Sequence, residues 1–198
     1  MVSHGPGHVI PFSFDLSVLV RRSVATLYSN LVTRPTGRAL RLGIESQIGE
    51  LGTCCVSVLD FTQVVVLDYS CADEAVAKLI LRYQREDRPA DAYFVARGLG
   101  EQHRHPIEEV LRRYRLALVA EIAGTGFTLL GEASPLERRA WAAVELAGTA
   151  PVDELADRLA APVALTRSAL DGLADRRVLL RGEGDAHFHA LTSLVRSR

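Results

Sequence analysis

In this sequence, the spacing of two histidine pairs comes closest to that of metal-binding residues. His103 and His105 flank one arginine, and His187 and His189 flank one phenylalanine. Residues two apart on a β-strand share a face, so a metal could contact both members of the second pair. Neither pair has a nearby cluster of Cys or His that would complete four ligands. We therefore predict surface imidazoles and no bound metal.

The turn from Thr33 to Arg38 has residue types that could hold an anion. It places Arg34, Arg38 and two threonines before a predicted helix, where free backbone N–H groups attract negative charge. The turn lacks the Gly-Lys-Ser/Thr of a phosphate-binding loop. A capped interhelical turn with solvated arginines is therefore the alternative to anion binding by Arg34 and Arg38.

Catalytic and redox motifs are not found in the sequence. There is no Ser-His-acid order, nucleophile elbow or paired-carboxylate motif, so we predict that the chain is not an enzyme and needs no cofactor. Cys54, Cys55 and Cys71 show no CxxC spacing. Adjacent cysteines point to opposite faces of a strand, which favours buried thiols in a reducing compartment.

The composition is that of an ordinary globular protein. The 198 residues suit one large domain or two small ones, and 48% hydrophobic residues suffice for real cores. No apolar run approaches the roughly 20 residues that span a bilayer, and the first residues lack the layout of a secretory signal. We expect a cytoplasmic protein with no membrane partner. The net charge of −1 gives no global attraction to nucleic acid.

Apolar residues up to Gly131 alternate between strand and helix spacing, which predicts an α/β fold with a mixed sheet covered by helices. The first strand is expected over Val9–Phe14, with Pro11 favouring an edge position. The other expected strands cover 54–60, 63–68, 92–96, 116–122 and 127–130, and the expected helices cover 16–31, 38–51, 72–85 and 106–115.

The pattern changes after Gly131. Ser134 and Glu137 have the spacing of a capping box that starts a helix. Three helices, over 135–146, 152–159 and 163–176, are followed by a predicted strand, turn and strand within 178–191. This is the order of a winged helix-turn-helix, so we expect an α/β domain over residues 1–131 and a small winged-helix domain over 134–198.

Residues 40–130 resemble the STAS-like family, relatives of the anti-sigma-factor antagonists. The resemblance rests on a strand ending in Leu59-Asp-Phe61, an apolar segment ending in Asp68-Tyr-Ser70, and a following helix. It implies a STAS-like fold whose surface binds a regulatory protein partner. In the antagonists, the serine at the start of this helix is phosphorylated and the surface around it binds the partner kinase.

Ser70 matches that serine, and Asp68, Ser70 and Asp73 are the implied partner-binding residues. The chain departs from the family at the next position, where Cys71 replaces the common glycine. Asp73 and Glu74 would repel a phosphate on Ser70. The alternative is that Ser70 is a helix N-cap whose hydroxyl accepts from the N–H of Asp73.

The third C-terminal helix would be the DNA-reading helix of the winged helix. Thr166, Arg167 and Ser168 could reach bases, while Arg176 and Arg181 could reach phosphates. Residues 134–198 contain as many acidic residues as arginines, which weakens the electrostatic case for DNA. We predict a non-enzymatic transcription regulator that couples a partner-binding domain to DNA. The alternative is a protein-interaction adaptor whose winged helix contacts protein or forms a homodimer.

Overall fold

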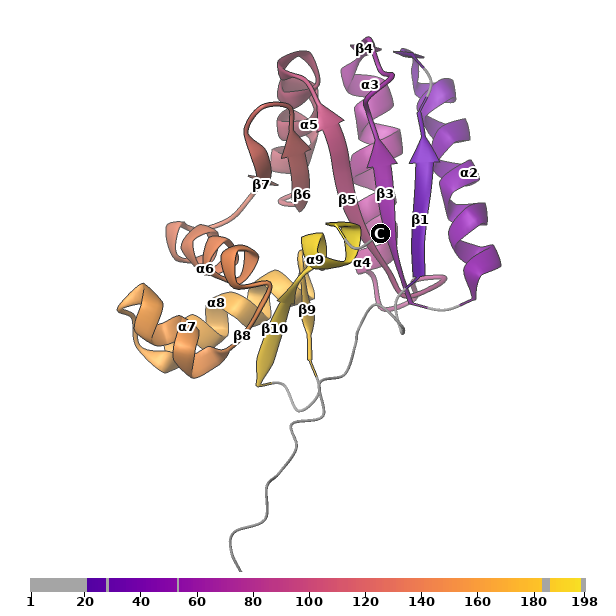
Figure 1. Cartoon of the computed structure of the whole chain (residues 1–198). Helices are drawn as coiled ribbons and strands as arrows, with labels where there is room; N and C mark the ends of the chain where they lie inside the picture. Colours follow the sequence, from indigo (N-terminus) through magenta and orange to yellow (C-terminus); the bar gives the residue numbers. More distant parts are fainter. Residues whose placement is uncertain (1–20, 28, 53, 183–185, 197–198) are drawn as a thin grey trace, which may run out of the picture.

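The computed structural model describes residues 21–27, 29–52, 54–182 and 186–196. Within them the fold is mixed α/β (Figure 1). A five-stranded sheet has the order β1-β3-β5-β6-β7; neighbouring strands are parallel except for β7, which is antiparallel to β6. The strands are β1 (Arg21–Thr26), β3 (Cys55–Asp60), β5 (Ala92–Leu99), β6 (Ala117–Ile122) and β7 (Gly126–Gly131).

Helices connect the parallel strands and cover one face of this sheet. Side chains alternate between the two faces of a strand, so Leu59 and Leu118 pack in the core under the helices. The helices are α2 (Arg34–Leu51), α3 (Tyr69–Ala72), the π-helical segment η1 (Asp73–Lys78), α4 (Leu79–Gln84) and α5 (Glu101–Arg113). The segments α3, η1 and α4 follow one another without a break and form the connection from β3 to β5.

The C-terminal part of the chain, residues 135–196, packs on the opposite face of the sheet. Val58 and Val119 point to that face and share a second core with Leu170 and Phe188. The last helix of this part lies beside β3 and β5 (Figure 1). The elements are α6 (Pro135–Ala147), β8 (Thr149–Pro151), α7 (Val152–Leu159), α8 (Val163–Asp175), β9 (Leu179–Arg181), β10 (His187–Ala190) and α9 (Leu191–Arg196), with β8-β10-β9 forming a three-stranded sheet.

The N-terminal elements differ from the sequence-based expectation. The predicted strand Val9–Phe14 lies outside the described residues. The predicted helix over 16–31 is wrong for its described part, because residues 21–26 form β1 and pair with β3. The next helix begins at Arg34 rather than Arg38, since the hydroxyl of Thr33 caps it.

Two elements in the middle of the chain also differ from expectation. We expected residues 64–67 on the main sheet, but β4 (Val66–Leu67) pairs with β2 (Asn30–Leu31) in a separate two-stranded sheet. Helix α5 begins five residues before the predicted start and contains Pro106.

Candidate partner-binding surface

Asp68 holds together the starts of two helices. Its carboxylate accepts hydrogen bonds from the backbone N–H of Thr33 (3.0 Å) and of Cys71 (2.7 Å). The hydroxyl of Ser70 donates to the same carboxylate at 2.9 Å. Burial opposes ionisation of Asp68, but these hydrogen bonds outweigh it and lower its pKa. The expected N-cap role of Ser70 is therefore wrong, because Asp68 is the cap of α3.

Arg34 and Asp73, predicted as members of two different sites, form one ion pair. Nη1 of Arg34 lies 2.7 Å from Asp73 and 3.1 Å from Glu74, and Lys78 also contacts both carboxylates. Burial opposes ionisation of Asp73, but hydrogen bonds from Arg34, Tyr114 and Lys78 lower its pKa. Asp73 is 4% exposed, so it does not lie on the surface where a partner contact was expected.

The close approach of α2 to η1 explains why these charges meet. A Cβ on Gly37 would lie 2.8 Å from the carbonyl oxygen of Cys71, so the helices come together where α2 has no side chain. The π-helical segment is wider than an α-helix and turns both Asp73 and Glu74 inward. Nη1 of Arg34 is engaged by these two carboxylates, while the side chain stays half-exposed. Arg38, one turn further along α2, is exposed.

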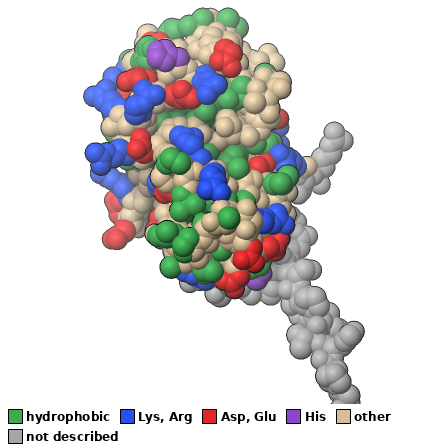
Figure 2. Space-filling view, turned by 90° about the vertical axis from the view of Figure 1, so that its left-hand side faces the viewer, with side chains coloured by type: hydrophobic (Ala, Val, Ile, Leu, Met, Phe, Trp, Pro, Cys, Tyr) green, Lys and Arg blue, Asp and Glu red, His purple; other side chains and the backbone are tan. Residues whose placement is uncertain are grey.

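Above these helix starts lies an exposed apolar surface that we call the apical patch. It consists of Val32 (39% exposed), Val65 (65%), Val66 (46%) and Tyr69 (47%). Figure 2 shows hydrophobic side chains along the top of the molecule, where Figure 1 places β4 and α3. Exposed side chains of this size on adjacent segments mark an interaction site more often than scattered single ones do.

Thr33, which directly follows Val32, has a strained backbone. Its φ is +76°, a region that β-branched residues rarely adopt. The conformation is held by the hydrogen bond from its N–H to Asp68 and by its hydroxyl, which accepts from Thr36 N–H. Backbone strain of this kind is often found at functional sites, so it supports the interpretation of the apical patch as a binding surface.

The two histidines of α5 differ in their surroundings. His105 is exposed and lies edge-on to Tyr69, with 5.8 Å between ring centroids. His103 is 2% exposed, so the prediction of a surface imidazole is wrong for it. Its Nδ1 accepts from the N–H of Gly100 at 3.1 Å, and burial lowers its pKa. Within the described parts of the chain, no group of three or more His, Cys, Asp or Glu is placed to hold a metal.

The predicted DNA-reading residues do not form one exposed surface. Thr166 is fully buried and faces the core rather than the solvent. Arg167 and Ser168 are exposed on α8, beside the exposed apolar side chains of Val163 and Leu165.

The two arginines expected to reach phosphates make ion pairs and hydrogen bonds within the protein, although Arg181 is exposed. Arg176 pairs with Glu137 and donates to the carbonyl of Glu132 at 2.6 Å. Arg181 contacts Asp171 at 3.2 Å and Asp175 at 2.9 Å.

The apical patch itself was missed by sequence reasoning. Residues 63–68 were expected as a strand of the main sheet, and of the four apolar side chains in it only Val64 and Leu67 are buried. Alternation along a strand leaves every second side chain on the other face. Alternation does not account for two adjacent exposed side chains, Val65 and Val66, so no local pattern signalled this surface.

Comparison with known protein families finds no family model that matches the chain, and comparison with curated proteins finds no match either. Among the described helices, none combines the length and apolar character that crossing a bilayer requires.

Proposed function

We propose that this chain is a non-enzymatic regulatory adaptor that binds a protein partner on the apical patch. The observation that carries the proposal is the exposure of Val32, Val65, Val66 and Tyr69 around the hydrogen-bonded frame of Asp68 and Ser70. The frame fixes the backbone beneath the patch, which lowers the entropy lost on binding. Asp68 and Ser70 therefore support the partner surface rather than supply its main contacts.

The charges beside the patch define the kind of partner. Arg34 and Arg38 lie in the first two turns of α2, which begins two residues after Val32, and both are exposed. Arg34 already forms ion pairs with Asp73 and Glu74, so Arg38 is the more available cation for a partner. An apolar centre with a basic rim fits a partner segment with an apolar face and an acidic edge.

The resemblance to the STAS-like family agrees with this proposal but rests on sequence. It is supported by the order of β3, the short strand β4 and the helix α3, which contains Ser70. The C-terminal part follows the order of a winged helix, and we propose that it supports the sheet rather than reads DNA. Internal pairing of Arg176 and Arg181 favours this role.

DNA reading by α8 is the second candidate function. The exposure of Arg167 and Ser168 favours it, because these are residue types that read bases in the major groove. Fluorescence anisotropy with genomic fragments at low salt tests it directly. Binding that weakens on Arg167→Ala would favour the regulator that acts on DNA over the adaptor.

Site-specific photocrosslinking tests the adaptor function. A photoreactive residue at position 65 should give one discrete protein adduct in cells, whereas the same residue at Leu146, which is 85% exposed outside the patch, should not. With the purified partner, Val66→Asp should abolish binding, and Arg38→Glu should weaken it by roughly tenfold. Both positions are exposed, so neither change should unfold the chain.

Three results would contradict the adaptor proposal. They are the same adducts from positions 65 and 146, no adduct at position 65, and unchanged binding of the purified partner after Val66→Asp.

A further inference from the structure

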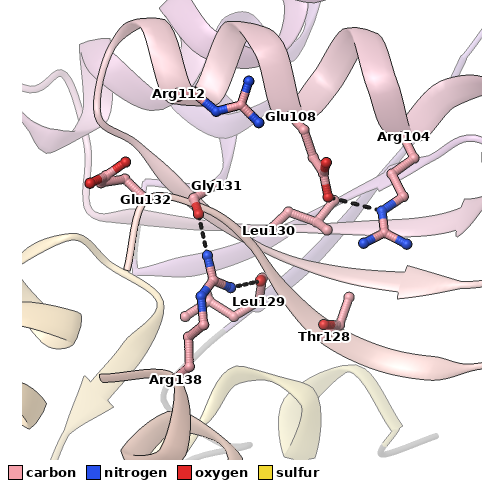
Figure 3. A pocket seen from close by; sticks show the side chains of 9 residues that line it. All are labelled: Arg104, Glu108, Arg112, Thr128, Leu129, Leu130, Gly131, Glu132 and Arg138. Carbon is pink, nitrogen blue, oxygen red and sulfur yellow. Dashed lines mark hydrogen bonds and ion pairs between the residues drawn. The ribbon is translucent and has the colours of Figure 1, made fainter. Parts of the chain in front are cut away.

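Three arginines from two helices line a cavity of about 260 Å³ beside the edge strand β7 (Figure 3). Arg104 and Arg112 come from α5, and Arg138 comes from α6. Thr128, Leu129 and Leu130 of β7 form the wall between them. The cavity therefore joins the helical layer, the sheet and the C-terminal part.

Contacts within the protein orient each guanidinium group. Arg138 donates to the backbone carbonyls of Leu129 (2.7 Å) and Gly131 (2.5 Å), which fix its position without neutralising its charge. Arg104 contacts Glu108 through Nε at 2.9 Å, and Figure 3 shows its two terminal nitrogens without a partner among the residues drawn. Arg112 contacts Glu109 through Nη1 at 2.8 Å, which leaves its other nitrogens for a ligand.

The charge balance of the lining favours an anion. Glu108 and Glu132 also line the cavity, so three arginines face two glutamates. Glu108 already engages Arg104, and Glu132 is exposed. Glu109 pairs with Arg112 from outside the lining, so the guanidinium charge that is not paired with a carboxylate is that of Arg138. Arg104 and Arg112 add N–H donors that their glutamates do not use.

We infer that this cavity binds a small phosphate monoester. A tetrahedral phosphate presents oxygens in several directions and can meet guanidinium groups from different elements at once, whereas one arginine satisfies both oxygens of a carboxylate. The cavity is larger than a phosphate group, so it leaves room for a small organic part. Because α6 begins just after β7 ends at Gly131, the ligand contacts both parts of the chain.

Calorimetric titration of the full chain at constant ionic strength tests this site. Inorganic phosphate should bind saturably with one site per chain, glycerol 3-phosphate should bind at least as tightly, and acetate should not bind. Arg104→Gln and Arg112→Gln should each weaken phosphate binding by roughly tenfold or more, as the loss of a charge-assisted hydrogen bond does. Arg158→Gln is the matched control, because Arg158 is also 44% exposed and also pairs with a glutamate four residues away.

Several outcomes would overturn the inference. These are no saturable phosphate binding, equal binding by the Arg104→Gln and Arg112→Gln variants, and acetate binding as tight as phosphate binding. Binding of phosphate together with rejection of the ester would also overturn it. Val66→Asp leaves this cavity unchanged, so the phosphate site and the partner surface are tested separately.

Discussion

The guanidinium group of Arg177 lies over the ring of Tyr93, 4.0 Å from its centroid. Arg177 follows α8, whereas Tyr93 belongs to β5, so this contact joins the C-terminal part to the sheet. Nε of Arg177 also donates to the carbonyl of Ala92 at 2.8 Å, and its Nη2 pairs with Asp91. One side chain thus makes three contacts across the junction.

Arg177→Ala should lower the free energy of unfolding by about 2 kcal/mol, because it removes a stacked cation and leaves a carbonyl without its donor. Urea unfolding measures the change. Arg115→Ala is the matched control, since Arg115 also has a positive φ but is exposed. Equal destabilisation by the two substitutions would contradict a role for Arg177 at the junction.

The two parts of the chain should unfold together, because the second core contains side chains from both. Trp141, the single tryptophan of the chain, is buried in that core. Its fluorescence and the far-UV circular dichroism should give the same urea midpoint. Phe188→Ala should lower the free energy of unfolding by about 3–5 kcal/mol, whereas the exposed Leu146→Ala should change it little.

Two separate transitions, or a stable fragment released by proteolysis at 131–134, would instead favour independent domains. The division at residues 131–134 therefore stays a prediction that this experiment tests.

Stability should fall as the pH drops below about 6.5, because burial lowers the pKa of His103 from its ordinary value of 6.5. The unfolded state then binds more protons than the folded state, so the contribution is complete above pH 6.5 and is lost as the pH falls toward the folded pKa. His103→Asn should reduce this dependence, as measured by urea midpoints between pH 7.5 and 5. The exposed His105→Asn should leave it unchanged.

His189 also has a pKa lowered by burial, so part of the pH dependence should remain in the His103→Asn variant. An identical pH dependence in wild type and His103→Asn would contradict the assignment.

Thr33→Gly should stabilise the chain by about 1 kcal/mol, since glycine adopts a φ of +76° without strain and loses little as an N-cap. Thr33→Ala keeps the strain and loses the cap, so it should destabilise the chain. Thermal unfolding of both variants separates the two effects. Equal melting temperatures for the glycine and alanine variants would show that Thr33 stores no strain.

Local patterns predicted most central elements, but not those that depend on distant partners. Strand β3 and the hairpin of β6 and β7 follow from their apolar runs and turn residues. Across residues 21–27, the spacing of Val24 and Leu27 also fits a helix, and only the pairing of β1 with β3 selects the strand. A helical pattern likewise does not tell which side of α8 faces the second core, so Thr166 was assigned to the surface.

The sequence predicted single residues of the candidate site but not the contacts that bring them together. Asp68 and Ser70 were identified from the resemblance, and Arg34 from its place before a helix. Their connection depends on the approach of Gly37 to Cys71, which no local pattern encodes. Arg104, Arg112 and Arg138 are spread over two helices, and only the fold brings them to one cavity.

The second core, which the sheet shares with the C-terminal part, has an evolutionary consequence. Val58 and Val119 of the sheet pack in the same cluster as Leu170 and Phe188, so a change of volume on one side must be matched on the other. Substitutions at these positions should therefore covary among homologues, although they lie far apart in sequence. Exchange of the C-terminal part alone would join mismatched surfaces, so a chimera with the C-terminal part of a homologue should be less stable than either parent.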